Sequence, residues 1–162
     1  MEQCAETPAG PSAGPSAEPP GPLLVVDGAN VVGSVPDGWW RDRRGAAERL
    51  RDGLVEVAAA GVPGAPGPLA VVLVVEGAAR GVAGVPGVRV VSAAGSGDDR
   101  IVELVAAESA LAPGRRLLVA TADRGLRERV AALGAELLGP RAVRRDPRAP
   151  RPSDHPSDHP SE

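Results

Sequence analysis

The stretch LLVVDGAN, residues 23–30, decides the fold of this 162-residue chain. Its apolar half, residues 23–26, stops abruptly at Asp27-Gly28, which is typical of a buried strand that ends in a turn. Two other apolar runs also lead to an acidic residue: Glu76 follows residues 69–75, and Asp123 follows residues 117–121 after a single alanine. These runs predict three strands that each end near a carboxylate.

Helical patterns separate the apolar runs. The sequence predicts helices over residues 37–60, 98–111 and 124–133, and further short strands over residues 88–91 and 135–138. In the second helix, Ile101, Leu104, Val105 and Leu111 are expected to face inward. Strands that alternate with helices predict a three-layer α/β/α domain with a four- to five-stranded, mainly parallel, Rossmann-like sheet.

The composition limits the partners and the compartment. The chain has no Phe or Tyr and all 18 basic residues are Arg, so at least one of Trp39 and Trp40 is expected to fill the aliphatic core, with base stacking as the alternative. A net charge of −3 gives no general attraction to nucleic acid. Cys4 is the single cysteine, and no signal segment or membrane span is recognisable, which predicts a cytoplasmic protein.

The two ends of the chain differ from its middle. Residues 1–22 are rich in Pro, Ala and Gly, and residues 140–162 contain an Arg-rich run followed by two SDHP repeats. Both ends are expected to be disordered and to flank a single domain at residues 23–139. The Arg-rich run either adds nonspecific affinity for phosphate or is simply solvated.

The acidic residues near the strand ends are candidate metal ligands. In an open parallel sheet the carboxyl ends of the strands meet at one edge, where ligands bind. Carboxylates gathered there repel one another, and a bound cation is a natural reason to bring them together. The candidate ligands are Asp27, Glu76, Asp98, Asp99 and Asp123.

Each candidate also has an ordinary structural interpretation. Asp27-Gly28 is a common turn pair, Glu76 could simply end a strand, and Asp123 could cap a helix. Ser96 and Asp99 fit a helix N-terminal capping box, which leaves Asp98 as the better ligand of the two neighbouring aspartates.

Four polar residues are candidates for substrate binding. Asn30 and Thr121 could hydrogen-bond a phosphate or a water on the metal, and Arg124 could face a substrate phosphate with its planar guanidinium. Arg80 could do the same, or it could pair with Glu76 four residues earlier.

Four motifs together resemble the YacP-like branch of the NYN domains, in the PIN-like nuclease superfamily. They are VVDGANVVGS at 25–34, VVEGAARG at 74–81, GSGDDRIVELV at 95–105 and ATADRGLRERVAALGA at 120–135, in the family's order. The resemblance implies a PIN-like sheet with Mg²⁺ or Mn²⁺ at Asp27, Asp98 and Asp123, and it places Asn30 and Thr121 at polar active-site positions. Glu76 stands where such domains more often have Asp.

The resemblance implies a metal-dependent ribonuclease that acts in RNA processing or turnover, with Asp27, Asp98 and Asp123 as catalytic residues. Metal-assisted hydrolysis would leave a 5′-phosphate and a 3′-hydroxyl. A non-catalytic or weakly catalytic RNA-binding protein of the same fold is the alternative. A phosphatase or nucleotide hydrolase is disfavoured, because Ala29 stands where an Asp-x-Asp motif needs its second acid, and a phosphate loop is excluded because the chain has no Lys.

Overall fold

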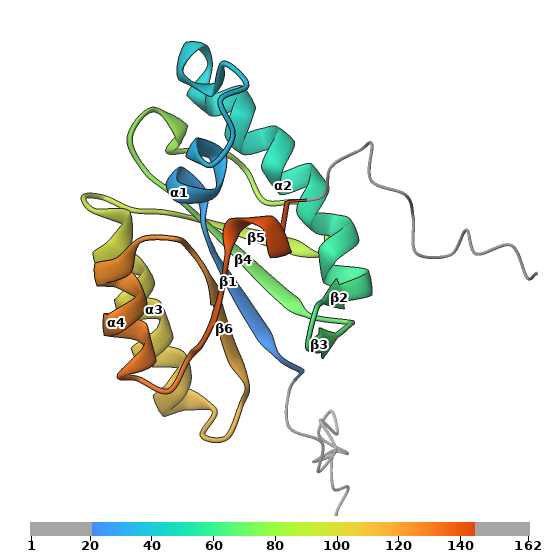
Figure 1. The fold of residues 1–162 in the computed structure, drawn as a ribbon, viewed down its shortest axis with the longest axis vertical. Coiled ribbons are helices and arrows are strands. Elements are labelled where there is room, and N and C mark those ends of the chain that lie inside the picture. The colour runs from blue at the N-terminus through green and yellow to red at the C-terminus, as the bar shows by residue number, and fades with distance from the viewer. Residues whose placement is uncertain (1–20, 145–162) are drawn as a thin grey trace, which may run out of the picture.

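A computed structural model describes residues 21–144 as a five-stranded sheet between two layers of helices (Figure 1). All five strands of this sheet are parallel. The expected three-layer α/β/α architecture is therefore confirmed, whereas the expected disorder at 1–20 and 145–162 lies outside the described residues. The strands, in their order across the sheet, are β5 (Val88–Ser92), β4 (Ala70–Val75), β1 (Leu23–Asp27), β6 (Leu117–Ala120) and β7 (Glu136–Leu138).

Strand β1 lies in the centre of the sheet and pairs with both β4 and β6. From β1 the chain builds outward through β4 to β5, then crosses back to β6 and builds outward to β7. The direction of winding therefore reverses between β1 and β6. In open α/β sheets, the crevice at such a reversal, beyond the carboxyl ends of the strands, is where ligands bind.

The side chains of β1 alternate between two hydrophobic cores. Leu24 and Val26 face the layer formed by α1 (Gly28–Gly33) and α2 (Arg43–Ala60). Leu23 and Val25 face the layer formed by α3 (Gly97–Leu111) and α4 (Arg124–Ala131). All four side chains are at most 3% exposed, so the sheet is covered on both faces, as its continuous apolar strands predict.

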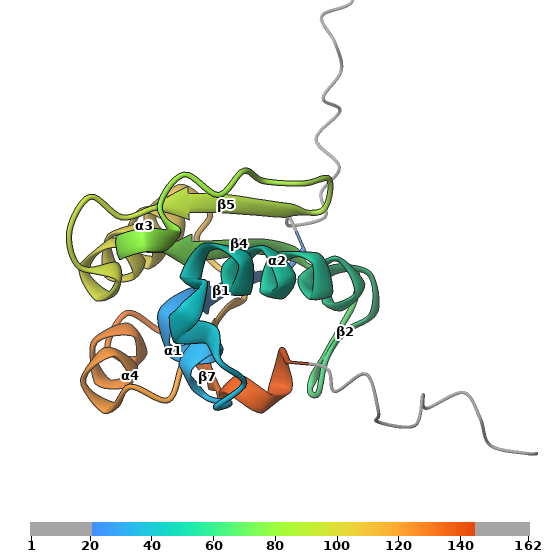
Figure 2. The same cartoon turned by 90° about the horizontal axis from the view of Figure 1, so that it is seen from above.

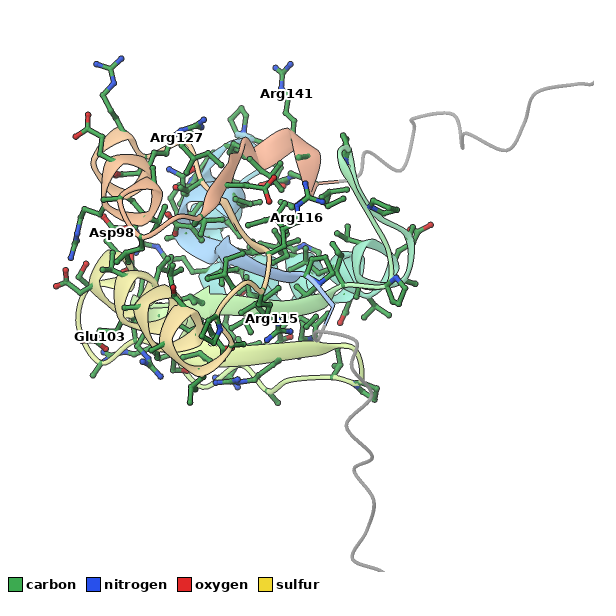
Figure 3. All side chains as sticks on the ribbon, turned by 90° about the horizontal axis from the view of Figure 1, so that it is seen from below. Asp98, Glu103, Arg115, Arg116, Arg127 and Arg141 are labelled. Carbon is green, nitrogen blue, oxygen red and sulfur yellow. The ribbon has the colours of Figure 1, made fainter. Side chains whose placement is uncertain are left out.

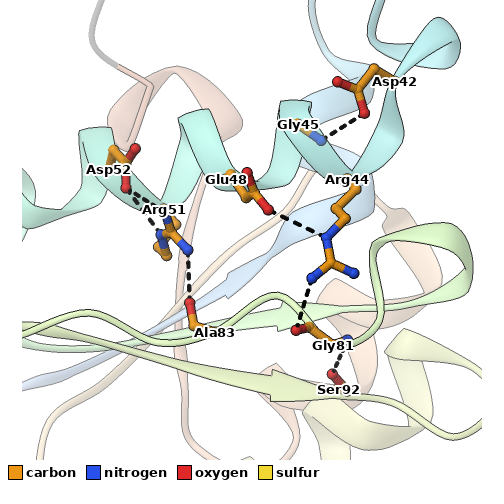
Figure 4. Close-up of polar contacts among 9 residues, drawn as sticks. All are labelled: Asp42, Arg44, Gly45, Glu48, Arg51, Asp52, Gly81, Ala83 and Ser92. Carbon is orange, nitrogen blue, oxygen red and sulfur yellow. Dashed lines mark hydrogen bonds and ion pairs between the residues drawn. The ribbon is translucent and has the colours of Figure 1, made fainter.

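Helix α2 holds the long connection between β4 and β5 against its own face of the sheet (Figure 4). Arg44 donates a hydrogen bond to the carbonyl of Gly81 (3.4 Å), and Arg51 donates one to the carbonyl of Ala83 (2.9 Å). Within this connection lies the short 3₁₀ helix η2 (Gly77–Ala79).

The first expected helix begins later in the structure than its pattern indicated. Asp42 caps α2 by accepting a hydrogen bond from the backbone N–H of Gly45 (2.9 Å), so the helix starts at Arg43 instead of residue 37. The residues before it form the 3₁₀ helix η1 (Trp39–Arg41), in which no side chain is buried. The expectation that a tryptophan fills the core is therefore wrong.

Three further features differ from the expectations. A short α1 follows Asp27 where only a turn was foreseen, and the loop after α2 contains a small hairpin of β2 (Gly61–Val62) and β3 (Ala65–Pro66). Leu111, expected to face inward, is 79% exposed because α3 extends past the edge of its core.

The folded chain continues past the expected boundary at Gly139. Residues 140–142 form the 3₁₀ helix η3 (Pro140–Ala142), and the Val143 side chain after it is only 2% exposed. Arg144 donates hydrogen bonds to the carbonyls of Val31 (3.0 Å) and Val32 (3.3 Å) in α1. This last segment therefore belongs to the domain. No helix in residues 21–144 is long and apolar enough to cross a membrane.

Candidate active site

Asp27 is the last residue of β1 and the N-cap of α1, and its side chain is only 5% exposed. One carboxylate oxygen, Oδ1, accepts a hydrogen bond from the backbone N–H of Asn30 (3.4 Å), and the other, Oδ2, accepts one from the Thr121 hydroxyl (2.9 Å). Gly28 lets α1 start this close to the sheet, because a Cβ atom there would lie 2.6 Å from the Val74 carbonyl oxygen. The DGAN motif thus fixes one buried carboxylate at the edge of the sheet.

The residues after β6 close against Asp27. Thr121 is fully buried, and its hydroxyl oxygen also accepts a hydrogen bond from the backbone N–H of Asp123 (3.1 Å). The Asn30 side-chain oxygen accepts one from the backbone N–H of Ala122 (2.8 Å), and Asp123 caps α4 through the N–H of Leu126 (2.8 Å). The ends of β1 and β6, far apart in sequence, are therefore joined at the point where the winding reverses.

Glu76 and Asp98 approach the same edge from β4 and α3. The Glu76 carboxylate accepts a hydrogen bond from the backbone N–H of Gly97, which is the first residue of α3. Asp98 follows in the first turn of α3, where its side chain is half-buried between α3 and α4 (Figure 3). The starts of α1, α3 and α4 lie together at this end of the sheet in both ribbon views (Figures 1 and 2).

The carboxylates at this edge influence one another's protonation. The pKa of Asp27 is raised to about 6, mainly by burial and to a smaller extent by repulsion from Asp98 and Glu76, against the lowering effect of the Thr121 and Asn30 hydrogen bonds. The pKa of Asp98 is also raised, first by burial and then by the charges of Asp123 and Glu76. The structure therefore brings Asp27, Glu76, Asp98 and Asp123 into one electrostatic cluster, which we call the carboxylate cluster.

Asp99 lies at the margin of the carboxylate cluster, because its charge makes only the smallest contribution to raising the pKa of Asp98. Its backbone N–H donates a long hydrogen bond (3.5 Å) to the Ser96 hydroxyl, as the capping interpretation expects, and its carboxylate forms an exposed ion pair with Arg129 (3.0 Å). Successive residues on a helix point about 100° apart, so only one of the two neighbouring aspartates can face the cluster.

The two candidate arginines have different surroundings. Arg80 donates hydrogen bonds to the carbonyls of Gly77 (3.2 Å) and Ala94 (3.2 Å), and within residues 21–144 it forms no ion pair with Glu76. Its guanidinium joins two loops near the start of α3. Arg124, which follows Asp123 in the chain, instead lines an open hollow formed by α4 and β7.

That hollow contains a residue that the sequence interpretation missed. Besides Arg124 it is lined by Arg127, whose guanidinium donates a hydrogen bond to the Thr121 carbonyl (3.1 Å) and so lies directly behind the site (Figure 3). The sequence contains a signal for Arg127, because it lies three residues after the candidate Arg124 in a predicted helix. Residues three apart on a helix share a face. The other lining residues are Ala122, Glu128, Ala131 and Leu137.

The carboxylate cluster has the chemistry of a site for a hard divalent cation, because all its ligand atoms would be oxygens. A carboxylate has about four lone-pair positions, so the hydrogen bonds to Asp27 and Asp123 leave acceptors for an ion. Among the described residues, however, no three acidic, His or Cys side chains are already gathered closely enough to hold a metal. Ion binding at this edge would therefore have to draw the carboxylates closer together.

Comparisons with known proteins bear on the fold. No known family model matches the sequence, and no curated protein matches it. Two crystal structures of Rae1 (YacP) from Bacillus subtilis, one of them a point mutant, are similar to this structure with a TM-score of 0.59 each. Their sequences are 21% and 22% identical to this chain, and the matches cover 75% of it and 72% and 70% of those chains.

These matches confirm the fold that the sequence motifs implied. The chain has a YacP-like fold, with a parallel sheet between two layers of helices. At 21–22% identity, the likeness concerns the fold alone.

Proposed function

We propose that this protein is a Mg²⁺- or Mn²⁺-dependent ribonuclease that hydrolyses RNA phosphodiesters in RNA processing or turnover. One observation supports the proposal: four segments of a YacP-like fold each bring a carboxylate to the carboxyl end of the sheet, where the winding reverses. Keeping acids together, with the pKa of two of them raised, costs stability, and such costs are concentrated at functional sites. The single Cys4 is the sequence feature that supports a cytoplasmic location.

The residues of the cluster would divide the work. Asp27, Asp98 and Asp123 would hold the ion, with Glu76 as a further ligand, and the cation would supply charge neutralisation at the phosphodiester and activation of water. Asp27 is the fixed member because Thr121 and Asn30 orient both of its oxygens. This fixed carboxylate would position the others around it.

The arginines would bind the substrate outside the cluster. Arg124 lines the open hollow and follows Asp123 in the chain. Its guanidinium would donate two hydrogen bonds to a phosphate of the substrate. Arg80 would contribute mainly charge, because its guanidinium already donates to two backbone carbonyls.

Cleavage of labelled RNA tests the proposal. The purified full-length chain is incubated with single-stranded and with structured RNA in Mn²⁺, in Mg²⁺ and in EDTA, beside Asp27→Asn and a control variant, Glu103→Gln. Glu103 is an exposed acid of α3 that pairs with Arg100 outside the cluster. We expect cleavage by the wild-type chain and Glu103→Gln in either metal, and none with EDTA or with Asp27→Asn. Absence of cleavage of both RNAs in both metals would refute the ribonuclease.

A second candidate is an RNA-binding protein that has lost turnover. The observation that favours it is that no three ligand side chains in residues 21–144 are already in place for a metal. In that case RNA would bind equally well with and without EDTA, with a steep dependence on salt, and no product would form.

A further inference from the structure

The loop between α1 and α2 carries an exposed aromatic patch that the proposed active site does not use. Trp40 is 52% exposed and Val35 is 39% exposed. They are two of the four large apolar side chains that are exposed within residues 21–144, and both lie in this one loop. Trp39, half-buried beside them, meets Trp40 edge to face with ring centroids 5.9 Å apart. Exposed apolar groups clustered in this way mark interaction sites.

The charges around the patch favour a polyanion. The Arg43 guanidinium lies 5.5 Å from the centroid of the Trp39 ring, and Arg41, next to Trp40, is exposed. The two acids of the loop are already engaged, since Asp37 pairs with Arg144 (2.6 Å) and Asp42 caps α2. The patch therefore combines an open aromatic face with two arginines, Arg41 and Arg43, that form no ion pair within residues 21–144, and such a combination binds unpaired bases and their phosphates.

The patch lies close to the carboxylate cluster. Helix α1 begins directly after Asp27 and ends six residues later at Gly33, a length of about 9 Å at the usual rise per residue. The Trp39 ring packs against that end, where a Cβ on Gly33 would be 3.8 Å away. In Figure 1 the loop, in light blue, projects from the end of the molecule where the strands reach their carboxyl ends. Helix α1 therefore connects the carboxylate cluster, at its start, with the aromatic patch that packs against its end.

We propose that Trp40, with Trp39 and Arg43 behind it, is a stacking platform for an unpaired base of single-stranded RNA adjacent to the carboxylate cluster. This inference rests on the proposed ribonuclease for its choice of ligand and extends it, because it requires the substrate to be unpaired on the α1 side of the site. Stacking needs a base whose face is free, so duplex RNA would not engage the platform.

The protein contains its own reporter for this test. Trp39 and Trp40 are the only tryptophans and there is no Tyr, so all intrinsic fluorescence comes from the patch. The full-length chain is titrated with a single-stranded oligoadenylate and with an RNA duplex of equal length, both in EDTA, so that binding is measured without cleavage. We expect quenching by the single strand and much weaker quenching by the duplex.

Variants separate stacking from charge. Trp40→Ala keeps Trp39 as reporter and should weaken binding of the single strand about tenfold, as expected for one stacked base. Trp40→Phe should retain most of the affinity, and Leu111→Ala, which removes another exposed apolar side chain at the far end of α3, should bind as the wild type does. Thermal unfolding checks that each variant is folded, which is expected because Trp40 is exposed.

The outcomes also distinguish the two proposals. Equal quenching by duplex and single strand, or wild-type affinity in Trp40→Ala, would overturn the platform even if the chain cleaves RNA. Selective quenching that Trp40→Ala weakens would establish the platform even if no metal supports cleavage, and then only the ribonuclease would fail.

Discussion

Charged side chains at the amino ends of the strands (the amino edge) and at their carboxyl ends (the carboxyl edge) have opposite surroundings. At the amino edge, Arg116 and Glu136 form a two-fold hydrogen-bonded pair (2.5 and 2.8 Å), which lowers the pKa of Glu136. Arg115 pairs with Glu108 (3.2 Å) at the same edge. At the carboxyl edge, burial and repulsion instead raise the pKa of Asp27 and Asp98. The charges at the amino edge are paired, whereas the carboxylates at the carboxyl edge repel one another, and this difference agrees with the proposed function of the carboxyl edge.

The strongest test of this contrast is to remove one carboxylate from each edge. Asp27→Asn should lower ribonuclease activity by about 100-fold or more, the usual loss when one electrostatic group of a preorganised site is removed. The same change should raise the free energy of unfolding at neutral pH, because it removes a buried charge. Glu136→Gln should leave activity unchanged. Initial cleavage rates and urea unfolding measure both effects, and a destabilised Asp27→Asn would break the comparison.

The pH dependence of the free energy of unfolding should show directly that burying the Asp27 charge destabilises the fold. Folding raises the Asp27 pKa from 3.8 to about 6, so the folded chain binds a proton more tightly than the unfolded chain. The stability that this group contributes is full below about pH 3.8, declines between pH 3.8 and 6, and is lost above that, a change of about 3 kcal/mol. Urea unfolding of the wild type and of Asp27→Asn across this range gives the difference. A difference that is flat, or that grows in favour of the wild type with rising pH, would contradict the assignment.

Removing the hydroxyl that donates a hydrogen bond to Asp27 should make the buried carboxylate more destabilising. Thr121→Val keeps the shape of the fully buried side chain but leaves the Asp27 Oδ2 without its donor. At pH 7 the free energy of unfolding should fall by about 1–2 kcal/mol, the cost of one buried hydrogen bond to a charged group. Thr121→Ser, which restores a hydroxyl, should recover most of it in the same thermal or urea assay. Equal losses in both variants would mean that packing, and not the hydrogen bond, is responsible.

The smallest effect is expected at the amino edge. Glu136→Gln breaks a well-formed ion pair, but both partners are largely exposed, so water and salt replace most of the interaction. The melting temperature should shift less than in Thr121→Val, and the shift should vanish in high salt. A large drop in melting temperature that does not depend on salt would show that the Arg116–Glu136 pair stabilises the amino edge more than its exposure indicates.

Much of the carboxyl edge could be predicted from the sequence, because its acids follow strands. Asp27 and Glu76 directly follow apolar runs, and parallel strands bring such positions to one edge. What the sequence could not predict was the hydrogen bond between Thr121 and Asp27, 94 residues apart in the chain, which depends on β1 and β6 being neighbours. That pairing is a property of the topology and has no local signal.

The features that the sequence did not predict, helix α1 and the exposed tryptophan, have local sequences that favour other structures. Helix α1 consists of GANVVG, whose glycines and β-branched valines are poor helix formers, so its cap at Asp27 and its burial against β4 must supply what propensity does not. The tryptophans were expected in the core because hydrophobicity alone cannot say whether a loop side chain turns inward. Trp40 turns out instead.

The return of the chain to α1 has a practical consequence for expression. A shortened protein that stops at Gly139 would lose the buried Val143 and would leave the carbonyls of Val31 and Val32 without the guanidinium that covers them. The helix freed in this way is α1, which Asp27 caps, so such a truncation would loosen the segment that holds this buried carboxylate. Deletion series and affinity tags should therefore begin beyond Arg144.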